Sequence, residues 1–264
     1  MKKSLGIYGD SYGSTAPPSF RNLKLAIGHT VNEVDEFWAT DQRLQNEYDI
    51  TNYSVPGTDF LYCYHKFVDT HHNYDKIVFI VTNSVRLGFT YKDKYFRFSN
   101  INDVPRNLLN CEDWFPGLEE PVRIVNSVSD YFNYMVNIEF TDAAQAKLIE
   151  IMQANRKQTH GDDIIIIYAF QNKFIAESSA NLFDISEREI DIISDRPMFF
   201  AENLDLRNAH MCRENNKIFA DYILERLAGS KQILDYEKFG KISQSELDLY
   251  FRSPDLLKVH HDDT

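Results

Sequence analysis

The chain has 264 residues, 43% of them apolar, and its 28 Lys and Arg against 40 Asp and Glu give a formal net charge of -12. The length suits a single domain over residues 1–264, and the acidic balance argues against nucleic acid or an anionic membrane as a partner. No window reaches the roughly 18 apolar residues that a membrane span needs, and three cysteines without close pairing or zinc-ligand spacing are typical of a reducing compartment. We therefore expect a cytoplasmic protein without a disulfide scaffold or a metal site.

The first part of the chain alternates short apolar runs with segments of helical period, which is the pattern of a parallel sheet wrapped by helices. The run at residues 76–82 is apolar almost throughout, as expected of a strand that is covered on both faces. In chain order we predict a strand at residues 4–8, a helix at 34–47, a strand at 49–55 followed by Pro56 and Gly57, a helix capped by Thr58, and a strand at 76–82.

The pattern is weaker at residues 84–127, which we interpret as an insertion after the third strand. Two aromatic runs around Lys92 and Lys94 predict a small hairpin there, either a plain surface hairpin or a wall over the site. The order of elements predicts an α/β fold of three α/β/α layers around a flavodoxin-like parallel sheet. The remaining predictions are helices at 129–135 and 141–156, a strand at 164–170, an irregular segment at 171–207, a helix at 212–227 ended by Gly229, and a C-terminal helical extension at 231–264 with a capping box at Ser243 and Glu246.

A serine follows the first predicted strand, at the place where an α/β enzyme would present a nucleophile. Gly9 and Gly13 allow a sharp turn that lifts the Ser11 hydroxyl out of the sheet edge. Gly57 and Asn83 follow the second and third strands, and the carboxyl ends of parallel strands lie along one edge of a sheet. We therefore expect these residues to converge, although such turns also occur as ordinary structure or as phosphate cradles.

Four segments of the chain resemble the four sequence blocks of the SGNH (GDSL-type) hydrolase family. They are residues 9–11, 52–57, 82–84 and the segment that begins at His210, and together they cover most of the chain. The sequence around His210 is also similar to that of SGNH proteins encoded by tailed bacteriophages, and for such a protein the compartment would be the host cytoplasm. The resemblance implies a small-molecule or glycan ester as substrate, without metal or cofactor.

The site that the resemblance implies has the parts that acyl transfer needs: a nucleophile, a base and oxyanion donors. Ser11 would attack the carbonyl carbon, and His210 would act first as base and then as acid toward the leaving alcohol. The backbone amides of Ser11 and Gly57 and the side chain of Asn83 would form the oxyanion hole. We therefore predict an esterase or acetylesterase that uses a serine nucleophile.

Two departures from the family pattern concern the acid and the third block. The aspartate that usually lies three residues before the histidine is replaced by Arg207, which cannot accept a hydrogen bond from the imidazole ring. Asp205 is the nearest carboxylate and Glu202 a poorer candidate, and a backbone carbonyl could also hold the ring in a Ser-His dyad. In the third block, Thr82 and Ser84 replace a glycine and an aspartate.

The alternative is a non-catalytic module on the same fold that binds a ligand or a protein. It would use residues 9–14 as a phosphate cradle, or the insertion as a contact surface. This alternative is favoured by the arginine at position 207, where the family usually has an aspartate. The acidic net charge and the absence of lysine from the turn argue against phosphate binding.

Overall fold

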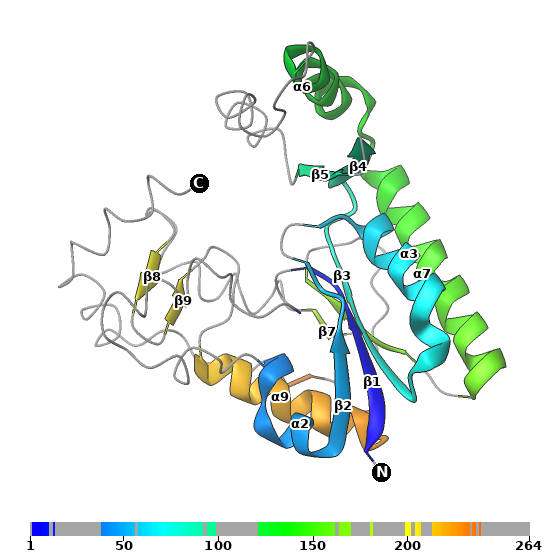
Figure 1. Cartoon of the computed structure of the whole chain (residues 1–264), viewed down its shortest axis with the longest axis vertical. Helices are drawn as coiled ribbons and strands as arrows, with labels where there is room; N and C mark the ends of the chain where they lie inside the picture. Colours follow the sequence, from blue (N-terminus) through cyan, green and yellow to red (C-terminus); the bar gives the residue numbers. More distant parts are fainter. Residues whose placement is uncertain are drawn as a thin grey trace.

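The computed structural model describes residues 2–10, 13, 38–55, 58–91, 94–98, 121–161, 164–169, 180–181, 199–201, 204–206, 213–232, 234–235 and 238. These residues form an α/β fold with a five-stranded parallel sheet in the order β2-β1-β3-β6-β7 (Figure 1). This order confirms the predicted doubly wound, flavodoxin-like sheet. The strands are β1 (Lys3–Tyr8), β2 (Tyr48–Asn52), β3 (Lys76–Val81), β6 (Ile165–Tyr168) and β7 (Ala180–Asn181).

Helices cover both faces of the sheet, as Figure 1 shows. One face packs against α2 (Gln42–Glu47), the short helix at Trp38–Thr40 and α9 (Arg213–Leu227). The other face packs against α3 (Phe60–Thr70) and α7 (Ile138–His160). The three layers expected of this fold class are therefore present.

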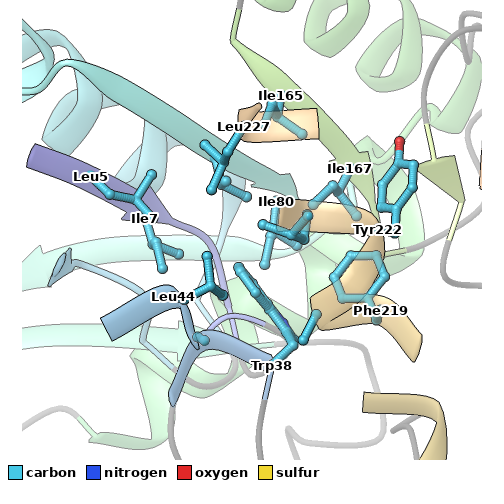
Figure 2. Packing of buried hydrophobic residues seen from close by; sticks show 14 of the residues in the cluster. Leu5, Ile7, Trp38, Leu44, Ile80, Ile165, Ile167, Phe219, Tyr222 and Leu227 are labelled. Carbon is cyan, nitrogen blue, oxygen red and sulfur yellow. The ribbon is translucent and has the colours of Figure 1, made fainter. Parts of the chain in front are cut away.

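The side chains of the central strands alternate between two buried clusters, because successive residues of a strand point to opposite faces. On the α9 side, Trp38 meets Phe219 edge to face with ring centroids 5.4 Å apart (Figure 2). On the α3 side, Tyr8 stacks on Tyr53 at 5.2 Å, and its hydroxyl lies 2.8 Å from the Thr70 hydroxyl. These clusters fix the sheet on which the loops of the candidate site stand.

The amino edge of the sheet is held by a buried arginine from the end of α7. Arg156 is 1% exposed, and its guanidinium donates to the carbonyl oxygens of His71 (2.9 Å), Tyr74 (2.6 Å) and Asp75 (3.1 Å). The Asp75 carboxylate in turn accepts hydrogen bonds from the backbone N–H and the hydroxyl of Ser4. Arg156 thus ties α7 to the segment that leads into β3.

Several predicted boundaries differ from the observed ones. The N-cap of α3 is Asp59, whose Oδ1 accepts the Tyr62 N–H at 3.0 Å, so the prediction of Thr58 as cap is wrong. Residues 129–135, predicted as one helix, divide between the end of α6 (Pro121–Asp130) and a π-helical turn at Tyr131–Met135. The predicted hairpin is confirmed as β4 (Leu87–Tyr91) and β5 (Lys94–Phe98), which pair antiparallel.

The segment at residues 171–207, predicted as irregular, contributes short strands. They are β7 at the sheet edge and the antiparallel pair β8 (Phe199–Ala201) and β9 (Leu204–Leu206). Ser243 and Glu246, the predicted capping box, lie outside the described residues. Over the described part of the chain, no helix combines the length and the apolarity that crossing a bilayer requires.

Candidate active site at the carboxyl edge of the sheet

The strand order places a topological switch point between β1 and β3. From β1 the chain proceeds to β2 on one side, and β3 then pairs with β1 on its other side. In open α/β sheets, ligands bind in the crevice outside the carboxyl ends of the strands at such a point. The loops after β1 and β3, which carry the predicted Ser11 and Asn83, flank this switch point.

The turn after β1 packs directly on the sheet. The Gly13 N–H donates to the Asp10 carbonyl at 3.0 Å, which closes a tight turn between these two residues. A Cβ atom on Gly9 would lie 2.6 Å from the Ile80 Cβ, and one on Gly13 would lie 2.9 Å from the Ile80 Cδ1. Glycine is therefore required here by close approach to β3. Ser11, which follows Asp10 in sequence, lies outside the described residues.

The loop after β2 is bound to this turn by its backbone and by one side chain. The Val55 N–H donates to the Gly9 carbonyl at 3.0 Å. The Asn52 side chain donates from Nδ2 to the Gly13 carbonyl at 2.6 Å and accepts the Ser54 N–H on Oδ1 at 2.9 Å. The loops of the first and second sequence blocks are thus held side by side. Gly57 itself lies outside the described residues.

Asn83, predicted as an oxyanion donor, is described and is partly buried after β3. Its Oδ1 accepts the Val85 N–H at 3.0 Å, and its carbonyl accepts the Arg86 N–H at 3.4 Å. Because the oxygen of the side-chain amide is held by a backbone donor, its Nδ2 hydrogens are left for another acceptor. The capping role and the predicted donor role are therefore compatible in one side chain.

A buried ion pair crosses the switch point. Arg86 Nη1 donates to the Asp10 carboxylate at 2.7 Å and to the Thr58 carbonyl at 3.0 Å. Asp10 is fully buried, and the Arg86 side chain is 10% exposed. Burial raises the pKa of the neighbouring Asp59 carboxyl, an effect that the Arg86 charge opposes. Arg86 thus connects the loops that follow β1, β2 and β3.

Ser84 and Thr82 connect this loop to α7. The Ser84 hydroxyl donates to the Asp142 carboxylate at 2.5 Å, and the Thr82 carbonyl accepts a hydrogen bond from Gln145 Nε2 at 2.9 Å. Asp142 and Gln145 are both buried. The Ser84 side chain and the Thr82 backbone thus connect the end of β3 to the first turns of the helix.

The second half of the predicted site is described only in part. Asp205 lies in β9, where its backbone pairs with Phe200. His210, Arg207 and Glu202 lie outside the described residues, and α9 begins at Arg213. Over the described ranges, no group of three or more His, Cys, Asp or Glu side chains is arranged to hold a metal ion.

The sequence interpretation missed the roles of Asn52 and Arg86. In the sequence, Asn52 stands out only as the start of the second block, although an asparagine at the end of a strand often bridges neighbouring backbone groups. For Arg86 a signal existed: a carboxylate predicted to lie at the end of a buried strand, such as Asp10, needs a cation nearby. The sequence alone does not indicate which of its basic residues supplies that cation.

The fold and these loops define a doubly wound α/β protein with a candidate site at its switch point. Comparison with protein-family models and with curated proteins gives no match for this chain.

Proposed function

We propose that this protein is a serine hydrolase that cleaves small acyl esters, with acyl groups carried by carbohydrates or similar small molecules as its substrate class. The proposal rests on the resemblance to the SGNH hydrolases at residues 9–11, 52–57, 82–84 and 210–216. One structural observation supports it above all. Hydrogen bonds join the loops after β1, β2 and β3 at the switch point, and these loops contain three of the four matching segments.

In the proposed reaction, the Ser11 hydroxyl attacks the acyl carbonyl carbon while His210 accepts its proton. The oxyanion would accept hydrogen bonds from the backbone amides of Ser11 and Gly57 and from Asn83 Nδ2. Each such donor lowers the barrier by roughly 2.7 to 4 kcal/mol in measured cases. His210 then protonates the leaving alcohol. In the second half of the reaction, His210 accepts a proton from a water molecule that attacks the acyl carbon, and it then returns the proton to Ser11 as the acid product leaves.

The orientation of the histidine is the part of this mechanism that departs from the family. We propose Asp205 as the acceptor behind the His210 ring, with a Ser-His dyad held by a backbone carbonyl as the variant to be distinguished. In a well-studied triad, replacing the acid by its amide lowers kcat by about 10⁴. Asp205→Asn should therefore reduce turnover strongly in a triad and leave it nearly unchanged in a dyad.

The experiment that tests the proposal combines labelling with turnover. A fluorophosphonate probe should label the wild-type protein on the peptide that contains Ser11, and p-nitrophenyl acetate should be hydrolysed. Ser11→Ala and His210→Ala should each abolish both signals. Ser230→Ala and His72→Ala, after the last turn of α9 and after the last turn of α3, serve as matched controls away from the carboxyl edge and should retain both.

Wild-type protein that is folded but neither labelled nor active would contradict the proposal. A thermal-shift screen with nucleotides and sugar phosphates on the same sample then tests the binding module. Stabilisation by such a ligand without esterase activity would establish that alternative.

A further inference from the structure

We propose that Arg86 is a positioning residue, which holds the turn that contains Ser11 in register with the loop that contains Gly57. The inference rests on the proposed function, because it concerns the geometry of the same site. Arg86 would not touch substrate. It would act through the backbone of the two loops whose amides are the proposed oxyanion donors.

The contacts of one nitrogen atom carry the argument. Arg86 Nη1 donates both to the Asp10 carboxylate, at 2.7 Å, and to the Thr58 carbonyl, at 3.0 Å. Asp10 directly precedes Ser11, and Thr58 directly follows Gly57. Because the same atom contacts both oxygens, the loops cannot separate without the loss of one hydrogen bond.

The burial of the pair makes these contacts difficult to replace by water. Asp10 is fully buried and Arg86 is 10% exposed, so a solvent molecule cannot easily take the place of either partner. A buried carboxylate that loses its cation is strongly unfavourable, whereas a paired and hydrogen-bonded one is tolerated. The Asp10 side chain is therefore expected to stay with Arg86 throughout the proposed reaction.

Arg86 is itself fixed by the turn that contains Asn83. The Asn83 carbonyl accepts the Arg86 N–H at 3.4 Å, and the Asn83 side chain caps the same turn through Val85. All three proposed oxyanion donors thus belong to segments that contact Arg86, two of them through its guanidinium group and the third through its backbone N–H. A misplacement of about 1 Å in such an arrangement can lower the rate by about 100-fold.

The chain offers a matched control at the opposite edge of the sheet. Arg156 is also a buried arginine whose guanidinium joins separate segments, through the carbonyl oxygens of His71, Tyr74 and Asp75. These residues precede β3, whereas Arg86 follows it. A variant of Arg156 should therefore lower stability without changing the geometry at the carboxyl edge.

The test compares Arg86→Met, Arg86→Lys and Arg156→Met with wild type, each at a temperature well below its own Tm. We expect Arg86→Met to lower kcat for p-nitrophenyl acetate about 100-fold with KM near the wild-type value. Arg86→Lys should recover part of this loss, because an ammonium group retains the charge and the donors. Arg156→Met should lower Tm but retain kcat. Hydrogen exchange at residues 9–13 should accelerate in Arg86→Met and not in Arg156→Met.

Folded Arg86→Met with wild-type kcat would overturn the inference, as would an equal loss of kcat in Arg156→Met. If Arg86→Met does not fold, the double variant Asp10→Asn, Arg86→Met removes the buried negative charge as well. It should fold and keep the low kcat, and wild-type kcat in the double variant would contradict our proposal. Wild-type protein without any activity would refute the proposed function instead, and hydrogen exchange at residues 9–13 would then decide whether Arg86 fixes the turn.

Discussion

Gly13 lies so close to Ser54 that a methyl group at position 13 would overlap the Ser54 hydroxyl oxygen. The same methyl group would lie 2.9 Å from the Ile80 Cδ1, which belongs to the central strand β3. The turn after β1 is thus enclosed by the neighbouring loop on one side and by the sheet below it. Its position depends on the absence of a side chain.

Gly13→Ala should therefore displace the turn and destabilise the protein. Overpacking of this kind costs about 1–3 kcal/mol, which urea unfolding would measure as a lower midpoint. The labelling rate of Ser11 by a fluorophosphonate should fall as well. Adding Ser54→Gly should restore part of the stability, since it removes the nearest atom. Equal stabilities of Gly13→Ala and wild type would contradict the observed packing.

Asp59 should make the stability of the protein depend on pH in a defined direction. Burial raises the pKa of its carboxyl group above the ordinary value, so the folded state binds the proton more tightly than the unfolded state. This contribution to stability is present at low pH and is lost as the pH rises through the raised pKa. Asp59→Asn keeps a cap for α3 and does not titrate. The stability of Asp59→Asn relative to wild type should therefore increase from about pH 4 to about pH 7. A difference in the free energy of unfolding between the two proteins that stays constant over this pH range would contradict the prediction.

His71 should make the stability of the protein depend on pH in the opposite direction. Its ring stacks on Phe67 with centroids 4.6 Å apart, and His160 and His72 face it at 5.7 and 6.0 Å. Burial, followed by the Arg156 charge, lowers its pKa, so the folded state favours the neutral ring. The stability that it contributes is present above about pH 6.5 and is lost as the pH falls through the lowered pKa.

His71→Phe keeps the stack on Phe67 and removes the titrating group. Between about pH 8 and about pH 5, Tm should fall less in this variant than in wild type. His72 and His160 are present in both proteins, so the difference between the two curves reports the removal of the His71 ring. A variant whose Tm falls as steeply as that of wild type would contradict the assignment.

Cys63 should be unreactive in the folded protein. The side chain is buried, and burial together with the nearby Asp10 and Asp59 charges raises the pKa of its thiol well above the ordinary value. The thiolate is the reactive form, so alkylation should proceed only as fast as the protein opens. A Cys111→Ser, Cys212→Ser variant isolates this signal. Rapid labelling by iodoacetamide without urea, followed by intact mass, would show that α3 does not cover the thiol.

The fold was predictable because hydrophobic periodicity determines which elements form. The run at Lys76–Val81 is apolar almost throughout and becomes the central strand β3, and the one-face spacing from Ile218 to Leu227 becomes α9. The strands at residues 180–181, 199–201 and 204–206 are not predicted from the sequence, since elements of two or three residues carry no measurable period. The cap of α3 was misplaced because Thr58 and Asp59 are adjacent and both suit that position.

The candidate site was predictable only as far as strand order determines it. The rule that parallel strands end at one edge brings the loops after β1, β2 and β3 together, and the structure has them joined. The contacts that join them depend on side-chain direction and reach, which sequence spacing does not contain. For this reason the hydrogen bonds of Asn52 and Arg86 emerged only from the structure.

The register of β3 with β6 has a consequence for the synthesis of the chain. Val78 pairs with Ile165, yet the hairpin, α6 and α7 all lie between these two residues in the sequence. On the ribosome, β3 therefore emerges well before its second neighbour, and its apolar edge stays open in the meantime. Non-local parallel pairing of this kind is slow and leaves nascent chains prone to aggregation, so expression should benefit from co-production of chaperones that cover this edge.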